Sequence, residues 1–120
     1  MSDFIRIKRV YEKADEQDGF RVLVDRLWPR GLSKEDAQID WWAKDLAPSD
    51  KLRKRFHKDR DFEVFAKDYR QELTVENAVR LFKKAGNHRV ITLLYASKDQ
   101  QQNNARVLRD FLDECQSDRE

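Results

Sequence analysis

The 120-residue chain contains 39% hydrophobic and 40% charged residues, a size and balance that suit one domain with a single apolar core and exclude a second domain. Its 25 basic and 23 acidic side chains leave a net charge of only +2, so composition gives no whole-molecule argument for nucleic-acid binding, which usually shows a strong basic excess. The single cysteine cannot form an internal disulfide, residues 1–10 lack a signal-peptide pattern, and no apolar run approaches the roughly 20 residues of a membrane span. We therefore expect a cytoplasmic protein that makes no membrane contact.

Four segments are predicted as strands. Residues 5–8 alternate isoleucine with arginine and lysine, which is typical of a strand with one wet face, such as an edge strand. Residues 20–27 and 90–95 contain unbroken apolar runs rich in β-branched side chains, which fit strands buried on both faces of a parallel sheet. Residues 40–46 are expected to form a fourth short strand.

Helices are predicted from capping residues and apolar spacing. Ser33 opens a short helix through a variant of the capping box, Ser49 and Thr74 are N-cap candidates, and Gly86 is a helix stop. This order of elements predicts a three-layer α/β domain with a small, mostly parallel sheet flanked by helices. The two clearest apolar stripes are Phe62, Phe65, Ala66, Tyr69 and Leu73, and then Ala105, Leu108, Phe111, Leu112 and Cys115.

The first candidate site follows the strand at residues 20–27. Ligands of open α/β sheets bind outside the carboxyl ends of the strands, and here Arg26 and Arg30 flank the turn formed by Trp28 and Pro29. Arginine offers planar, bidentate hydrogen bonds to phosphate or carboxylate, and proline stiffens the turn that aims it. A structural alternative stays open, in which Arg26 and Asp25 simply pair with neighbours across loops and Trp28 is a lid on the core.

The second candidate site follows the strand at residues 90–95. Tyr95 ends that strand, Lys98 and Asp99 come next, and Asn103 falls at the start of the last helix, where free N–H groups favour anions. Asp99 is the acid/base candidate if the site performs chemistry, since that role needs a carboxylate within reach of the reacting proton.

A basic run over residues 51–60 indicates either a solvated helix face or a phosphate-contacting patch. Arg53 stands apart because it lies beside an apolar position near the helix start, from which it can turn into the pocket. His57 and His88 lack ligand spacing, so we expect no metal and no cofactor. Cys115 lies on an apolar stripe and is expected to be a buried, inert thiol.

Several stretches match a known family in order and in spacing. They are Val-Asp-Arg-Leu-Trp-Pro-Arg-Gly-Leu at 24–32, Ala-Pro-Ser at 47–49 before Leu52 and Arg53, Phe65 with Tyr69, Arg70, Glu72 and Leu73, and Thr-Leu-Leu-Tyr-Ala at 92–96 with Asp99, Asn103 and Ala105. From about Ile5 to Leu112 the chain resembles the YeaO-like proteins, part of the larger group called domain of unknown function 488. The resemblance implies a single YeaO-like α/β domain over residues 1–120 and supplies no substrate.

One departure from longer relatives bears on chemistry. Those relatives carry a cluster of the Cys-His-Arg type after their last strand, whereas this chain has Gln-Asn-Asn-Ala-Arg at residues 102–106. The resemblance therefore transfers no thiol or metal chemistry to this region.

Three functions remain open. The first is a binder of, or an enzyme on, a small anionic and possibly phosphate- or nucleotide-containing ligand, held at the carboxyl ends of the strands. The second is a nucleic-acid-binding accessory protein that uses the basic run, and the third is an interaction module without catalysis. The residues expected to bind the ligand of the first function are Arg26, Trp28, Arg30, Arg53, Tyr95, Lys98 and Asn103.

Overall fold

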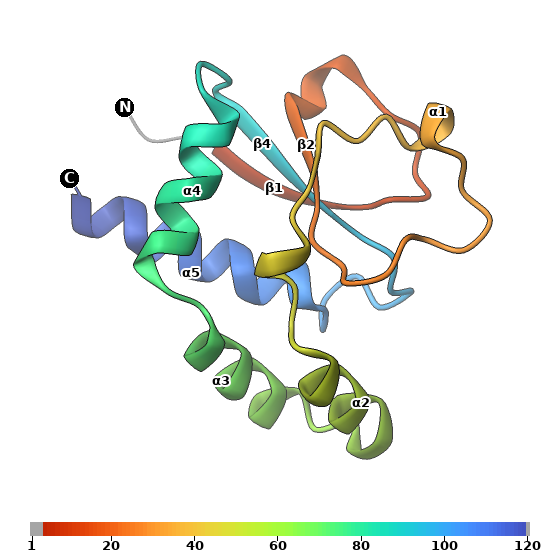
Figure 1. The fold of residues 1–120 in the computed structure, drawn as a ribbon, viewed down its shortest axis with the longest axis vertical. Coiled ribbons are helices and arrows are strands. Elements are labelled where there is room, and N and C mark those ends of the chain that lie inside the picture. The colour runs from red at the N-terminus through yellow and green to blue at the C-terminus, as the bar shows by residue number, and fades with distance from the viewer. Residues whose placement is uncertain (1–3, 120) are drawn as a thin grey trace.

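The computed structural model describes residues 4–119. Its strands and longer helices follow one another along the chain in the order that the sequence predicts (Figure 1). In chain order they are β1 (Phe4–Arg9), η1 (Glu16–Asp18), β2 (Phe20–Leu23), α1 (Lys34–Ala37), β3 (Trp41–Trp42), η2 (Lys44–Leu46), α2 (Asp50–Asp59), α3 (Phe62–Glu72), α4 (Val75–Ala85), β4 (Val90–Tyr95) and α5 (Asn104–Arg119), where η marks a short 3₁₀ helix.

The four strands form one sheet in the order β1-β4-β2-β3, and each neighbouring pair is parallel. This confirms the predicted α/β class with a small parallel sheet, and it places β1 at an edge, as its alternating pattern indicates. The strand predicted over residues 40–46 is wrong in its length. Only Trp41 and Trp42 pair with β2, because the chain then winds into η2, where Leu46 N–H donates to the carbonyl of Ala43 over 3.0 Å.

The two faces of the sheet carry different layers, since side chains alternate along a strand. Ile91, Leu93 and Tyr95 of β4 enter the main core, which also contains buried residues of α2 to α5. Leu94 enters a smaller apolar cluster with Val10 and Leu23 on the opposite face. Residues 25–42, including the short helix α1, supply the outer wall of that smaller cluster (Figure 1). Helices α2 to α5 therefore cover one face of the sheet, whereas loops and the short helix α1 cover the other face.

The predicted N-caps are confirmed. The side chains of Ser33, Ser49 and Thr74 accept hydrogen bonds from the N–H groups of Asp36, Leu52 and Asn77. Thr74 also receives a reciprocal bond, because its own N–H donates to the Asn77 side chain over 2.9 Å. Each cap satisfies a donor that the first helical turn leaves free, a contribution of about 1 kcal/mol.

The paired tryptophans of β3 point to opposite faces, as an extended backbone requires. Trp41 packs against the main core and lies beneath the cations of Arg80 and Lys84, at 5.7 and 5.6 Å from its ring. Trp42 packs against the smaller cluster, with the Lys44 ammonium 3.9 Å from its ring. The two rings thus fix the short strand from both sides.

Candidate functional site at the carboxyl end of the sheet

Asp25 joins the carboxyl ends of two neighbouring strands. It follows β2, and its carboxylate accepts hydrogen bonds from the N–H of Ala96, just after β4, over 2.9 Å and from Asn104 Nδ2, at the start of α5, over 3.0 Å. Its backbone carbonyl accepts from the indole of Trp42 over 2.8 Å. Burial raises the pKa of Asp25, and the two hydrogen bonds and the charge of Arg53 only partly oppose that rise. The Asp25 carboxyl group therefore links the segment after β2 to the segment between β4 and α5.

Arg53 is a cation whose charge lowers the pKa of this carboxyl group. It lies in the first turns of α2, where its Nη2 donates to Asp50 over 2.6 Å. Its Nε is buried and finds no hydrogen-bond acceptor among residues 4–119. Its charge favours ionised Asp25, although the two groups make no direct ion pair. Arg53 therefore presents an unused donor within electrostatic reach of a half-buried carboxyl group.

Arg26 is held at the start of the same helix. Its Nε donates to the carbonyl of Pro48 over 3.1 Å, and Pro48 precedes the N-cap Ser49. Ser49 is itself held by Glu72 of α3, which accepts from the serine N–H over 2.8 Å and from its hydroxyl over 2.6 Å. Arg26 and Arg53 are thus both anchored around residues 48–53, although they lie far apart in the sequence.

The structure places Trp28 and Arg30 in different settings. Trp28 is half-buried, donates from its indole to the carbonyl of Leu32 over 2.7 Å and meets Trp42 edge to face at 5.4 Å. Trp28 therefore packs against the smaller apolar cluster. The Arg30 side chain is exposed, and its backbone carbonyl accepts from the hydroxyl of Tyr11 over 2.8 Å.

The candidates after β4 serve mainly to shape the loop that leads to α5. Tyr95 is only 3% exposed, and burial raises the pKa of its phenol. Asn103 is buried and caps α5, because its side-chain oxygen accepts from Arg106 N–H over 2.9 Å. Asp99 accepts from the N–H groups of Gln102 and Gln101, which lower the pKa of this exposed carboxyl group. Lys98 is exposed.

Three contributors were not among the residues predicted to form the site. Asp25 and Asn104 form the central contact, and Arg9 ties β1 to the loop after β4 by donating to the carbonyls of Ser97 and Ala96 over 2.9 and 3.2 Å. One sequence signal for Asp25 existed, since a carboxylate directly follows the apolar run Val22-Leu23-Val24, which begins in β2. No comparable signal marks Arg9.

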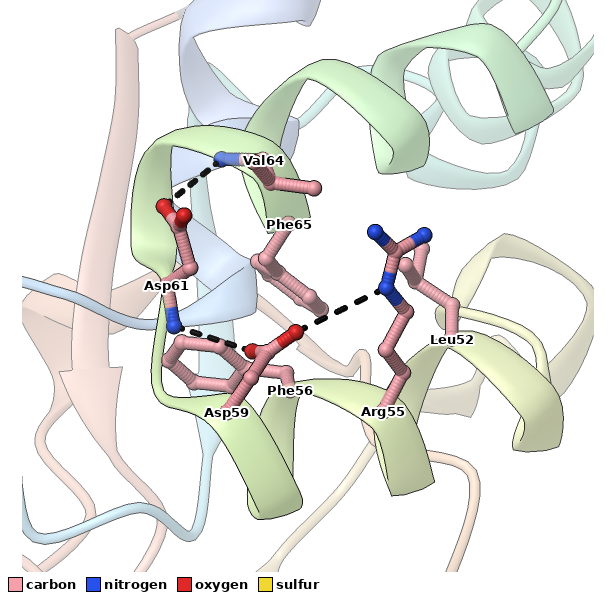
Figure 2. A pocket seen from close by; sticks show the side chains of 7 residues that line it. All are labelled: Leu52, Arg55, Phe56, Asp59, Asp61, Val64 and Phe65. Atoms are coloured by element: carbon pink, nitrogen blue, oxygen red, sulfur yellow. Dashed lines mark hydrogen bonds and ion pairs between the residues drawn. The ribbon is translucent and has the colours of Figure 1, made fainter.

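Three surface hollows lie away from all of these residues. The one in Figure 2 is a crevice between α2 and α3, where Phe56 and Phe65 fill the space and Arg55 pairs with Asp59 over 3.5 Å. Two open hollows, of about 440 and 460 Å³, lie on α4 and between β1 and α5. None of the three is lined by a residue that the sequence singled out for ligand binding.

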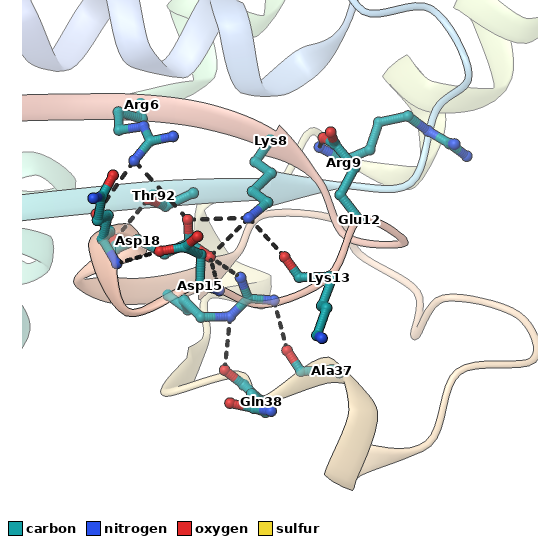
Figure 3. Close-up of polar contacts among 12 residues, drawn as sticks. Arg6, Lys8, Arg9, Glu12, Lys13, Asp15, Asp18, Ala37, Gln38 and Thr92 are labelled. Atoms are coloured by element: carbon teal, nitrogen blue, oxygen red, sulfur yellow. Dashed lines mark hydrogen bonds and ion pairs between the residues drawn. The ribbon is translucent and has the colours of Figure 1, made fainter.

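A second polar cluster lies on the loop-covered face of the sheet, around the fully buried Asp18 (Figure 3). Lys8 Nζ lies 3.0 Å from its carboxylate, and Arg21 forms a further ion pair with it. Burial would raise the pKa of Asp18, but hydrogen bonds from Asp15 N–H, Lys8 and Arg21 lower it below its usual value. Arg21 also donates from Nε and Nη2 to the carbonyls of Gln38 and Ala37, over 2.9 and 2.7 Å. This cluster fastens η1 and α1 to the sheet.

Among residues 4–119, no group of three or more His, Cys, Asp or Glu side chains is placed to hold a metal ion. Within the same residues, no helix is both long enough and apolar enough to cross a bilayer.

Together, the fold and this site define a small α/β protein in which a half-buried aspartate joins the segments that follow two neighbouring strands of a parallel sheet. The chain belongs to the family described as the inactive DUF488-N3 subclade, whose model matches residues 4–120. This confirms the assignment to the YeaO-like proteins of domain of unknown function 488.

The curated relatives match almost end to end. The uncharacterized protein YeaO of Escherichia coli (strain K12) is 44% identical over 110 residues, which cover 90% of this chain and 96% of YeaO. The uncharacterized proteins Mb3100c of Mycobacterium bovis and Rv3073c of Mycobacterium tuberculosis are each 39% identical over 109 residues, which cover 90% of this chain and 92% of theirs. No solved structure matches the chain.

Proposed function

We propose that the protein binds a small oxyanion at the carboxyl end of its sheet, through Arg53 and Arg26, and catalyses no reaction there. The observation that carries this proposal is the buried Nε–H of Arg53, which has no acceptor among the described residues. Leaving a buried donor unpaired costs about 1–3 kcal/mol, and such a group calls for an acceptor such as a ligand or an ordered water. Oxyanions suit the planar donor set of a guanidinium group.

The neighbouring groups favour an anion over a neutral ligand. Arg26 uses only its Nε on Pro48, which leaves its terminal nitrogens for a second contact. Arg30 and Lys98 are exposed, and their side chains have no partner among residues 4–119, so they would add to the positive field around the site. Trp28, Tyr95 and Asn103 would support the site as packing and capping residues.

Binding without catalysis is favoured for three reasons. The family description calls the subclade inactive, and residues 102–106 lack the thiol or imidazole that the longer relatives carry. Asp99 is also poorly suited to proton transfer, because its lowered pKa keeps it ionised and a general acid or base works best with a pKa near the working pH.

Nucleic-acid binding through the basic run is a weaker alternative. Carboxylates interrupt the run, since Lys54 pairs with Asp50 over 3.0 Å and Arg55 pairs with Asp59 and Asp68 over 3.5 and 3.3 Å. A run that is neutralised in part gives less of the counterion release that drives nucleic-acid binding.

The proposal is tested by titrating sulfate, phosphate, citrate and a nucleoside monophosphate into the protein in an isothermal calorimeter. We expect the Arg53→Met and Arg26→Met variants each to weaken binding by about 10- to 100-fold, the range for losing a charged hydrogen bond. The matched control is Arg55→Met, which makes the same change on the same helix, two positions beyond Arg53. Arg55 pairs with carboxylates of α2 and α3 and should leave the affinity within about twofold of wild type.

Two results would reject the proposal. If none of the four anions binds, the site does not take small oxyanions. If Arg55→Met weakens binding as much as Arg53→Met, the anions respond to overall charge. Far-UV circular dichroism of each variant establishes that the fold is intact before its affinity is compared.

A further inference from the structure

We propose that the outer edge of β1 is a dimerisation surface, on which a second copy of this chain pairs antiparallel to the first about a two-fold axis at Arg6. The sheet order places β1 at an edge, and no strand within residues 4–119 pairs with its outer side. Such an edge offers backbone N–H and carbonyl groups to another strand. This inference is independent of the proposed function, because it uses none of the residues assigned to the anion.

The backbone of β1 shows which residues face outward. Successive residues of a strand direct their N–H and carbonyl groups to opposite sides. The N–H groups of Phe4 and Val10 donate to the carbonyls of residues 89 and 95, on the β4 side, each over 2.8 Å. The even-numbered residues of β1 therefore face β4, and the backbone groups of Ile5, Ile7 and Arg9 point away from it.

Glu12 closes one end of this outer edge. Its carboxylate accepts from the Arg9 N–H over 3.1 Å, and its own N–H donates to the Arg9 carbonyl over 3.0 Å. Arg9 is thereby occupied within its own copy, and only Ile5 and Ile7 are left to bind a further strand. The free edge is short, which restricts the register that a partner strand can adopt.

A second copy fits that register. Antiparallel pairing about Arg6 places Ile5 of one copy opposite Ile7 of the other, and such a pair exchanges both of its hydrogen bonds. Every outward backbone group of the two isoleucines then has a partner. The same register puts the Phe4 side chain, which is 64% exposed, opposite Lys8 of the second copy, whose aliphatic stem can cover the ring. Both copies contribute the same residues, as a two-fold interface requires.

The cations of β1 are compensated within each copy. Arg6 meets its own counterpart at the axis, and directly opposed like charges destabilise a sheet. However, Arg6 Nη1 donates to the carbonyl of Gln17 over 3.2 Å and lies 4.0 Å from the carboxylate of Asp18. Lys8 pairs with the same carboxylate over 3.0 Å. The edge therefore lacks the free lysine that commonly protects an exposed strand from pairing.

Charges on α5 favour a second copy over an unrelated peptide. A hollow of about 460 Å³ lies between residues 4–7 and α5, and its helical side is lined by Arg109, Asp110 and Asp113. Helix α5 packs beside β1 and runs in the opposite direction (Figure 1). A two-fold axis at Arg6 therefore brings Arg109 of one copy toward Asp113 of the other, and symmetry repeats the pair. The two halves of the surface are thus complementary in charge.

The first test mixes two charge-reversal variants. Sedimentation velocity of the wild type from about 1 µM to about 1 mM should show a monomer–dimer equilibrium. Arg109→Glu and Asp113→Lys should each weaken the dimer by at least about tenfold, because each change makes both symmetric pairs repulsive. An equimolar mixture of the two variants should dimerise with nearly the wild-type affinity, because every charge then meets its opposite across the axis.

The matched control is Arg106→Glu. Arg106 is an exposed residue of α5, one turn before Arg109, and it lies outside the hollow. The same reversal of charge there should leave the dissociation constant within about twofold of wild type.

A second measurement requires no variant. Amide hydrogen exchange of the wild type is followed by nuclear magnetic resonance at about 20 µM and at about 1 mM. Exchange at the N–H groups of Ile5 and Ile7 should slow by at least about tenfold at the higher concentration, because pairing protects them. The N–H groups of Arg6 and Lys8, which face β4, should be protected at both concentrations.

Three results would overturn the proposal. The first is a wild-type chain that stays monomeric up to about 1 mM. The second is a dimer in which Ile5 and Ile7 exchange as fast as in the monomer, since that dimer uses another surface. The third is a mixture of Arg109→Glu and Asp113→Lys that associates no better than either variant alone. None of these results bears on anion binding.

Discussion

Thr92, in the middle of β4, donates its hydroxyl to the backbone carbonyl of Asp18 over 2.6 Å, although 74 residues separate them. The carboxylate of the same Asp18 accepts from Lys8 of β1 and pairs with Arg21 of β2. One fully buried residue is therefore tied to all three of the longer strands (Figure 3).

Asp18→Asn should destabilise the fold by about 3–5 kcal/mol, because it leaves the buried guanidinium of Arg21 without its counter-charge. Urea denaturation followed by circular dichroism measures the change in the free energy of unfolding. The matched control is Glu114→Gln, which breaks the exposed ion pair with Arg70 and should cost no more than about 1 kcal/mol. Equal effects of the two substitutions would contradict the role assigned to Asp18.

Gly19→Ala should be far more damaging than Gly86→Ala, although the two glycines have nearly the same backbone, with φ of 63° and 58°. A Cβ on Gly19 would lie 2.2 Å from the carbonyl oxygen of Val90, whereas one on Gly86 meets nothing within 4 Å. Backbone strain alone costs about 1–3 kcal/mol. Gly19→Ala should exceed Gly86→Ala by at least about 2 kcal/mol, because the obstacle is backbone and cannot rotate away. Thermal unfolding of both variants tests this, and similar midpoints would refute it.

Tyr69→Phe should lower the free energy of unfolding by about 1–3 kcal/mol. The phenol is fully buried and donates to the carbonyl of Leu46, so its removal leaves that carbonyl unpaired in the core. Tyr11→Phe is the control, because the Tyr11 hydroxyl also donates to a carbonyl, that of Arg30, but at the surface. Water can replace the lost bond at the surface, and the control should be nearly neutral in urea titrations.

Asp25→Asn should change how stability depends on pH, in the direction set by the raised pKa of Asp25. The folded protein holds this proton more tightly than the unfolded chain, so wild-type Asp25 adds stability as the pH falls through the folded-state pKa toward the ordinary value of 3.8. The asparagine variant lacks that gain. The stability of wild type minus that of Asp25→Asn should therefore increase on acidification from about pH 7 to about pH 4.

The control for this pH dependence is Asp99→Asn, since the pKa of Asp99 is lowered. Its contribution has the opposite sign: it is fully present above 3.8 and is lost as the pH falls through the lower folded-state value. Urea titrations at each pH, extended below pH 3.8 for this control, give both differences. If the two variants shift in the same direction, the charge environment assigned to Asp25 is incorrect.

Much of the fold follows from local patterns in the sequence. The apolar run at residues 90–95 gives β4 its observed bounds, and Ser49 and Thr74 begin α2 and α4 where their hydroxyls predict. These features depend on neighbours within one turn or one strand, so the sequence encodes them directly. There are two exceptions. Pairing with β2 decides the two residues of β3, and β2 itself ends at Leu23, although the predicted strand ran to residue 27.

The candidate site is less predictable for the same physical reason. The positions of Arg26 and Arg53 in the chain mark them as candidates, but nothing local indicates that Asp25 meets Ala96, 71 residues away. That meeting requires β2 and β4 to be neighbours, and hydrophobic periodicity does not specify strand order.

The sequence by itself therefore determined the class of fold, the helix starts, the strand faces and the family, because these arise from short-range spacing and from motifs. Tertiary structure alone decided which polar groups are buried together. Asp18 came to lie against Lys8, Arg21 and Thr92, and Asp25 came to lie between β4 and α5. The reason is that the strand order β1-β4-β2-β3 brings distant segments into contact, and desolvation then forces each buried charge to find a partner.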